Sequence, residues 1–457
     1  MDKGLDRRSF MQSTAAIGAG LFLSPAAFGQ GAAAGARKKD DINVALIGGG
    51  AEGQVLMNAI LKMGRNSGIR FRAVCDIWEA GNLRRVSRTL SAYKAYGHAG
   101  TGYVDYQDLL ASETDLDAVI VATPDFWHAP HAIASMKKGL HVYCEKEMSN
   151  DLAKAKEMVQ VSRQTGKLLQ IGHQRRSNPR YRFCEETIMR EAGLLGRVTH
   201  AYGQWNRSRA ACEDLGWPEG TEIPQAVLEK YGYKDMKQFM NWRWYKGLGG
   251  GPIVDLGSHQ IDIFSWFLGE ALPASVMASG GTDYWTDHEW YDNVITIYEF
   301  PTAKGLVRAT YQTLTTNSAN GYYEQFQGDE GTLLISESAA RGDVYREGWV
   351  PEEKWQPWVD KGVLLKVAAA TKPAAADTSA AADVRESVSP AQYKIPVTMN
   401  VPYHQPHLVN FFDAIRGAAT LNCPGEVGYH TAVMVLRVND AVAAARKLEF
   451  KPEDFAI

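Results

Sequence analysis

The sequence predicts an α/β N-terminal domain with a doubly wound, mostly parallel sheet, followed by an α+β C-terminal domain with a large open antiparallel sheet. Three observations support this fold class. Short apolar strands alternate with helical stretches up to about residue 175, a glycine-rich turn follows the first strand, and long alternating segments begin after about residue 180. The chain has 457 residues, of which 45% are hydrophobic and 22% charged, so it can hold two or three domains.

Charge and cysteine content exclude several classes of protein. Lys plus Arg total 49 against 52 Asp plus Glu, a formal net charge of -3, so no basic surplus favours nucleic acid and we expect no nucleic-acid partner. The five cysteines have no CxxC spacing, and an odd number cannot pair completely within one chain. A disulfide scaffold and a zinc ribbon are therefore excluded as organising features.

Residues 1–36 predict a cleavable export signal. A charged start containing Arg7 and Arg8 precedes a mildly apolar run at 15–23 and then small residues. The run is far shorter than the ~18 apolar residues that span a bilayer, so we expect no permanent membrane anchor. The Arg7-Arg8 pair resembles the signal read by the twin-arginine export machinery, which would place a folded protein in the periplasm; an ordinary secretory signal is the alternative.

The first strand and turn predict a dinucleotide-binding domain of the Rossmann type over residues 40–175. The apolar strand 43–47 leads into Gly48-Gly-Gly50-Ala-Glu-Gly53 and then a helix over 54–63. Gly48 permits the tight turn, Gly50 lets a pyrophosphate approach, and Gly53 lets the helix pack closely. A second strand at 71–75 ends in Asp76, where a carboxylate can bind a ribose hydroxyl, although Asp76 could instead merely cap a helix.

Three more apolar strands, at 116–122, 140–144 and 167–171, continue the parallel sheet. Helical stretches at 127–138 and 151–165 separate them, as parallel crossovers require. Ligands of such sheets bind beyond the carboxyl ends of the strands. The residues that this rule places on the cofactor side are Thr123, Pro124, Glu145, Lys146 and Gln174.

The second domain is predicted over residues 176–457. Alternating segments at 198–205, 293–300, 305–313 and 331–335 predict its antiparallel sheet. The stretch 368–383 is rich in Ala with Lys, Pro, Thr, Ser and Asp, and we expect an exposed loop there. The tail from 404 to 446 returns to helical spacing and should pack back on the body.

These motifs together resemble the Gfo/Idh/MocA family, which includes glucose-fructose oxidoreductase and inositol dehydrogenase. The markers are the glycine loop, Asp76, Ala122-Thr-Pro124 with His128, Gly139-Leu-His-Val-Tyr-Cys-Glu-Lys146, and Gly249-Gly-Gly-Pro-Ile-Val-Asp-Leu-Gly-Ser-His259. The resemblance implies a nicotinamide cofactor on the N-terminal domain, with His128 on the cofactor side, and a sugar or cyclitol against the C-terminal sheet. The family lysine falls on Lys146 and its Asp and His pair on Asp255 and His259. Glu147 replaces the family proline.

The predicted helix that begins near Pro252 carries Asp255, His259 and Asp262 on one face of an otherwise apolar segment. Oxidising a secondary alcohol requires a base within about 3 Å of the hydroxyl, and His259 is the best candidate. Asp255 could orient His259 or hold the hydroxyl, and Lys146 would stabilise an alkoxide-like oxygen. The alternative is that the aspartate and histidine simply pair with each other.

Further substrate contacts are expected from Arg176 and Tyr181, which follow a strand end, and from Trp244 in Asn241-Trp-Arg-Trp-Tyr245, although core packing explains the tryptophans about as well. His404 and His407 are spaced as metal ligands could be, but no acidic or cysteine ligand is near them in sequence, so we expect no metal.

The resulting prediction is an exported NAD(P)-dependent oxidoreductase that acts on a sugar or sugar-derived secondary alcohol. The alternatives are a redox-neutral glycoside hydrolase, lyase or isomerase that works through a transient keto-sugar, and a noncatalytic sugar- or cofactor-binding protein. Asp76 favours NAD over NADP, unless Arg84 and Arg85 reach a 2'-phosphate. Export in the folded state would require tightly bound cofactor. We also expect a homo-oligomer that associates through the C-terminal sheet.

Overall fold

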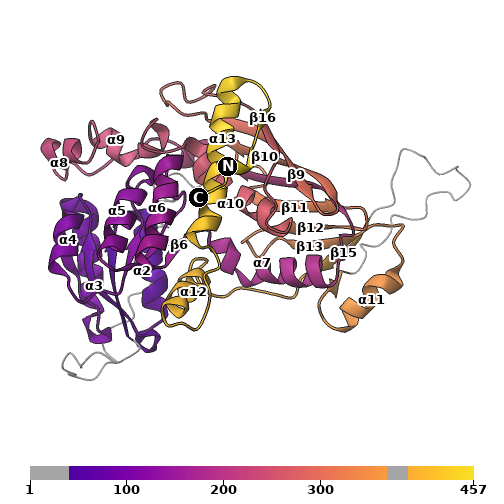
Figure 1. Ribbon diagram of the computed structural model, residues 1–457, viewed down its shortest axis with the longest axis horizontal. Coiled ribbons are helices and arrows are strands. Elements are labelled where there is room, and N and C mark those ends of the chain that lie inside the picture. Colours follow the sequence, from indigo (N-terminus) through magenta and orange to yellow (C-terminus); the bar gives the residue numbers. More distant parts are fainter. Residues whose placement is uncertain (1–40, 368–389) are drawn as a thin grey trace, which may run out of the picture.

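The computed structural model describes residues 41–367 and 390–457, which form two sheets (Figure 1). One sheet has six strands in the order β3-β2-β1-β4-β5-β6, and the other has ten in the order β14-β15-β13-β12-β11-β7-β10-β9-β8-β16. This arrangement confirms the predicted fold class. The export signal expected at 1–36 and the loop expected near 368–383 lie outside the described residues.

The six-stranded sheet is parallel throughout, and its central strands are buried on both faces because they are continuously apolar. The strands are β1 (Ile42–Ile47), β2 (Ile69–Cys75), β3 (Thr101–Tyr103), β4 (Ala118–Val121), β5 (His141–Cys144) and β6 (Leu169–Ile171). The helices around it are α2 (Ala51–Lys62), α3 (Arg84–Ala92), α4 (Tyr106–Ser112), α5 (Asp125–Lys137) and α6 (Leu152–Thr165). Strand order reverses between β1 and β4, which is the point where such sheets bind ligands.

The ten-stranded sheet is mostly antiparallel, as expected, with one parallel pair, β10 and β7. The pair is parallel because β7, the first strand of this domain, lies in the middle of the sheet between β10 and β11. The strands are β7 (Val198–Asn206), β8 (Ser275–Gly281), β9 (Asn293–Thr302), β10 (Gly305–Leu314), β11 (Tyr322–Gly328), β12 (Gly331–Ile335), β13 (Gly342–Arg346), β14 (Leu365–Lys366), β15 (Ala391–Lys394) and β16 (Leu448–Glu449).

Helix α10 (Gly251–Phe267) packs on β7 and β10 and is buried over nearly its whole length. Because α10 carries polar residues among apolar ones, those polar groups are placed inside the protein rather than in water. The other helices of this part of the chain are α7 (Pro179–Phe183), α8 (Gln225–Lys230), α9 (Met236–Met240) and α11 (Glu352–Asp360).

The chain returns at its C-terminal end to the first domain, as its helical spacing predicts. Helix α12 (Gln405–Ile415) packs against α2 and buries Leu408, Phe411 and Phe412 in the same apolar cluster as β1, β2 and β4. Helix α13 (Gly425–Ala444) lies against α6 on one side and α10 on the other (Figure 1). The two domains are therefore joined by shared helices as well as by the chain between them.

All five cysteines are buried and none forms a disulfide. Among the described residues, no helix combines the length and the apolar character needed to cross a membrane.

Candidate active site

The glycine loop has the geometry that the dinucleotide motif requires. Gly48 has φ +97°, and a Cβ there would lie 2.5 Å from the carbonyl oxygen of Ala122, so only glycine fits between β1 and β4. A Cβ on Gly53 would lie 1.9 Å from the carbonyl oxygen of Gly48. At Gly50 the added atom would meet only Asn82, 3.9 Å away, so the loop is open on that side. No side chain caps the N-terminus of α2, which leaves its N–H groups available to a diphosphate.

Asp76 closes the other end of this site. Its Oδ2 accepts hydrogen bonds from the Gly49 N–H at 2.8 Å and from Asn82, and its Oδ1 accepts from the Trp78 N–H at 2.8 Å. Burial raises the pKa of Asp76 to about 6, although these donors oppose the rise. The Asp76 side chain therefore joins the glycine loop to the end of β2. It lies at the position where the carboxylate of this motif binds a ribose hydroxyl.

Thr123, Pro124 and His128 follow β4. Thr123 Oγ1 lies 3.1 Å from His131 Nδ1, and Pro124 precedes α5 as its N-cap. His128 is buried, and its Nδ1 lies 2.6 Å from the carbonyl oxygen of Glu147. Because His128 supports the turn that carries Lys146, any effect it has on a cofactor passes through that turn.

Lys146 and Asp255 meet between the two domains. Lys146 Nζ lies 3.2 Å from Asp255 Oδ1 and also donates to the Asp255 carbonyl oxygen, while Arg243 Nε lies 3.2 Å from Asp255 Oδ2. Burial alone would raise the pKa of Asp255, but Lys146, Arg243 and Arg207 outweigh it and hold the pKa well below its usual range. Asp255 is therefore ionised, and it pairs with these cations instead of with His259.

His259 lies one helical turn beyond Asp255. Its side chain is almost fully buried, its Nδ1 has no hydrogen-bond partner among the described residues, and its ring centre is 5.2 Å from that of Trp205. Burial, followed by the charge of Lys146, holds the pKa of His259 well below its usual range. The imidazole is therefore neutral at physiological pH and can accept a proton. Asp262, one turn further, is committed to Arg176.

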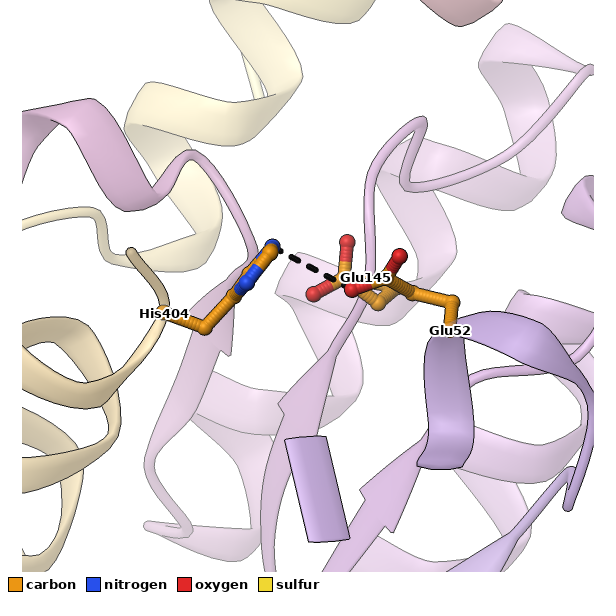
Figure 2. Close-up of side chains that lie close together, drawn as sticks. All are labelled: Glu52, Glu145 and His404. Carbon is orange, nitrogen blue, oxygen red and sulfur yellow. Dashed lines mark ion pairs between the residues drawn. The ribbon is translucent and has the colours of Figure 1, made fainter. Parts of the chain in front are cut away.

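Glu145 belongs to a cluster that the sequence did not predict. Figure 2 shows Glu52 from the first turn of α2, Glu145 after β5 and His404 at the start of α12 pointing toward one another, with His404 Nε2 3.2 Å from Glu52 Oε1. The acidic neighbours that His404 lacks in sequence are thus supplied by the fold. His407 takes no part, because its ring nitrogens contact Ser177 Oγ and the Ile171 carbonyl oxygen.

The three side chains could surround a cation, but the contacts present do not call for one. Glu145 already accepts hydrogen bonds from the Tyr143 hydroxyl and the Lys146 N–H, and His404 pairs with Glu52. Burial, followed by the charge of Glu52, raises the pKa of Glu145 to about 7. Glu145 is therefore a partly protonated acid at neutral pH, held by these two donors beside His404 and Glu52.

Glu147, which stands where the family proline would be, is completely buried. Its Oε1 accepts from the Met148 N–H at 2.8 Å, and its Oε2 has no partner among the described residues. Burial raises the pKa of Glu147 to about 8, and Asp125 adds to the rise. At neutral pH the side chain is therefore mainly a neutral carboxylic acid, at the position next to Lys146 in the chain.

Three of the residues expected to contact ligands are occupied by buried partners. Gln174 Nε2 donates to Glu337, Arg176 pairs with Asp262 and Glu270, and the Tyr181 hydroxyl donates to Glu324. Arg176 is only 4% exposed and Tyr181 is fully buried. In this structure, ion pairs and hydrogen bonds with other residues of the chain use the polar groups of Arg176 and Tyr181, and substrate binding by these two residues stays a prediction.

Trp244 lies at the rim of the site. Its ring stacks on that of His288 with centres 4.3 Å apart, and the preceding residue, Arg243, is the one that reaches Asp255. Sequence reasoning missed Arg243, although it stands in the same aromatic stretch as Trp244. It also missed Asp125, whose pKa burial and the charge of Asp255 raise to about 7.

The segment with α8 and α9, at the upper left of Figure 1, packs on Trp78, two residues after Asp76, in one apolar cluster that includes Leu228 and Met236. Trp78 donates from Nε1 to the Thr221 carbonyl oxygen, and Trp127 donates from Nε1 to that of Tyr231 at 2.9 Å. Lys230 also pairs with Asp105 after β3. The second domain thus holds the loops that follow β2, β3 and β4, an interaction that no local sequence pattern indicated.

Two family models match this chain. The model described as "Oxidoreductase family, NAD-binding Rossmann fold" matches residues 42–173, and the one described as "GFO/IDH/MocA C-terminal domain" matches residues 188–334. The chain belongs to the Gfo/Idh/MocA oxidoreductase family. Its enzyme class is therefore that of the NAD-dependent oxidoreductases, as the resemblance of its motifs implied, and NAD is the cofactor that its glycine loop and Asp76 fit.

Relatives within the Gfo/Idh/MocA family have different names. A glycosyl hydrolase family 109 protein of Shewanella baltica is 25% identical over 381 residues, which are 77% of this chain and 79% of that protein. The D-glucoside 3-dehydrogenase of Escherichia coli is 27% identical over 238 residues, 52% of this chain and 57% of that protein. Levoglucosan dehydrogenase in complex with NADH superimposes with a TM-score of 0.64 at 16% identity, over 90% of this chain and 99% of that one, which shows the shared fold.

Proposed function

We propose that this protein transfers hydride between NAD and a secondary alcohol carbon of a sugar. The observation that carries the proposal is the contact of Lys146, which follows β5, with Asp255 on α10, one helical turn before the buried His259. Lys146 follows β5, whereas Asp255 and His259 stand one turn apart on α10, so two segments distant in the sequence supply these side chains. The carboxyl ends of the strands are where parallel sheets of this kind bind their ligands. A protein that only bound sugar would not need a lysine, an ionised carboxylate and a neutral buried histidine together.

His259 would take the hydroxyl proton of the substrate while the C–H bond breaks. It suits this task because it is neutral and has a free Nδ1. Lys146 would hold positive charge against the oxygen as that proton leaves, and Asp255 keeps the lysine ammonium in place through the 3.2 Å contact. Bound NAD would supply the hydride acceptor.

A redox-neutral variant of this chemistry is the second candidate, and the family 109 glycosyl hydrolase relative favours it because the match extends over 381 residues. In that case the sugar carbon is oxidised transiently and the hydride returns after a glycosidic bond is broken. The D-glucoside 3-dehydrogenase relative favours net oxidation, but its match covers 238 residues. The same three residues serve both reactions, so the products decide between them.

The deciding experiment incubates the purified protein with a panel of free sugars and glycosides and identifies the products by mass spectrometry. Net oxidation lowers the mass of the sugar by two hydrogens, whereas cleavage of a glycoside releases a new reducing sugar. Wild-type protein should give one of these products, and Lys146→Met should give neither. Absence of any sugar conversion in a broad panel with NAD present would contradict the proposal.

We also propose that the protein is exported and that it keeps its cofactor. Arg7-Arg8 supports export, and the hydrogen bonds of Trp78 and Trp127 with the segment that carries α8 and α9 support cofactor retention. We propose that the protein is exported to the periplasm with NAD already bound, because a compartment without a cofactor supply would leave an empty enzyme inactive. Protein purified without added nucleotide should release stoichiometric NAD on denaturation. Empty protein that needs millimolar NAD would contradict tight retention.

The homo-oligomer is also a proposal, and the outer face of the ten-stranded sheet supports it. Met277, Ile295, Ile297 and Leu306 are exposed on β8, β9 and β10, and Met277 pairs directly with Ile297 across the strands. Exposed apolar side chains that gather on one sheet face are typical of association surfaces. Light scattering should find an oligomer that Ile297→Asp dissociates.

A further inference from the structure

We propose that Arg207 is a specificity-determining residue that binds the carboxylate of an acidic sugar, so that the substrate class is the uronic acids and their glycosides. This inference rests on the proposed function and narrows its substrate.

Arg207 is placed beside the base by a tryptophan that both contact. The guanidinium of Arg207 lies 5.5 Å from the ring centre of Trp205, and the imidazole of His259 lies 5.2 Å from the same ring. Arg207 directly follows β7, and its N–H donates to the Leu314 carbonyl oxygen at 2.8 Å, which fixes its backbone. Both side chains therefore lie around Trp205, and the proposal requires a sugar that extends from His259 along this ring to Arg207.

Arg207 has no carboxylate partner among the described residues, whereas a second arginine on the same tryptophan has two. Arg175 also lies 5.5 Å from the Trp205 ring centre, but Glu324 and Glu337 pair with its guanidinium in the buried interior. A half-buried guanidinium that lies against a tryptophan without a carboxylate contact can gain charge-assisted hydrogen bonds from an anionic ligand. The contrast indicates that Arg207 is kept free for a bound group.

The charges around the site point the same way. Lys146, Arg243 and Arg207 all act on Asp255, which is the single carboxylate that they surround and which is already shared by Lys146 and Arg243. Asp125 is nearby, but burial raises its pKa to about 7, so it neutralises the cations only in part. More than one positive charge is therefore left over, and of the three cations only Arg207 has no ion pair with a carboxylate among the described residues.

A carboxylate suits Arg207 better than other anions would. The planar guanidinium presents its donors as a fork that matches the two oxygens of a carboxylate. The diphosphate of NAD is provided for elsewhere, at the glycine loop and the free N-terminus of α2. A pyranose with a carboxylate on the ring and a hydroxyl at His259 satisfies both residues at once.

The test compares matched pairs of methyl pyranosides that differ only in a carboxylate or a hydroxymethyl group, in the gluco, galacto and manno series. Calorimetry measures their binding to the NAD-loaded wild type, to Arg207→Gln, and to Arg209→Gln as a control. Arg209 is two residues away, exposed, and paired with Glu213. At least one acidic glycoside should bind the wild type and Arg209→Gln about tenfold or more tighter than its neutral partner. Arg207→Gln should lose this preference, and Arg207→Lys should keep part of it.

Several results would overturn the inference. They are equal or tighter binding of the neutral member in every pair, an acid preference that survives Arg207→Gln, or weaker NAD binding by Arg207→Gln, which would assign the residue to the cofactor. Tighter binding of the sugar 6-phosphates than of the uronides would assign Arg207 to a phosphate. Hydride transfer to neutral sugars with no acid preference would refute the inference while leaving the proposed function intact. Uronide binding that depends on Arg207, without conversion of any sugar, would refute the proposed function and leave the inference about Arg207 intact.

Discussion

Replacing Glu147 with glutamine should stabilise the protein at neutral pH and flatten the dependence of its stability on pH. Burial raises the pKa of Glu147 from its usual 4.5 to about 8. Between these values the native protein holds a proton that the unfolded chain has released. The free energy of unfolding therefore falls as the pH rises through this window, and the contribution is intact only below about pH 4.5.

The size of the effect follows from the same values. Neutral pH lies about 2.5 units above the usual pKa of a glutamate, and each unit is worth about 1.4 kcal/mol, so about 3 kcal/mol of stability should be lost by pH 7. Solvent does not screen this carboxyl group, because Glu147 is 0% exposed. Glutamine keeps the oxygen that accepts from the Met148 N–H and has no proton to lose.

Urea unfolding followed by tryptophan fluorescence between about pH 5 and pH 8 measures the prediction. The stability advantage of Glu147→Gln over the wild type should increase with pH and reach about 3 kcal/mol near neutrality. Glu157→Gln, at an exposed position on α6, should follow the wild type at every pH. A difference between Glu147→Gln and the wild type that does not change with pH would refute the reasoning, because it would mean that Glu147 is ionised in the folded protein.

Three further predictions concern catalysis and cofactor choice. His259→Ala should lower kcat by about 100-fold or more while NAD binding, measured by calorimetry, stays unchanged; an active variant would remove the base assignment. Lys146→Ala should be impaired by a similar factor, about 100-fold, in rapid-mixing assays of hydride transfer, and a mild effect would show that the neutral acid of Glu147 has reshaped the site. Fluorescence titration of cofactor-free protein should show tighter binding of NAD than of NADP, because Asp76 repels a 2'-phosphate, and Asp76→Ala should narrow the difference. Tighter NADP binding by the wild type would show that Arg84 and Arg85 dominate.

The parts of the fold and site that depend on short-range patterns could be predicted from the sequence. Gly48 and Gly53 are fixed by a turn between neighbouring segments, and Asp76 by the end of the next strand. Strand β3 was not predicted because Thr101–Tyr103 is only three residues long and largely exposed, so it shows no apolar pattern.

The parts that depend on distant contacts could not be predicted. Tyr181 and Arg176 were expected at the substrate, but their partners Glu324 and Asp262 stand 143 and 86 residues further along the chain. The packing of the sheets and helices decides which polar groups pair in the interior. The local sequence around Tyr181 or Arg176 does not indicate these partners. His404 gives the opposite case, since its acidic neighbours were missing in sequence and are supplied by folding.

The contribution of α12 to the first domain affects the order in which the protein can be made. Leu408, Phe411 and Phe412 are at most 1% exposed and fill the apolar layer against β1, β2 and β4, yet they emerge from the ribosome more than two hundred residues after β6. The domain that is synthesised first must therefore wait, with part of its apolar surface uncovered, until almost the whole polypeptide has been translated. During that interval chaperones would bind the uncovered apolar surface. A fragment that stops after β6 should aggregate instead of folding.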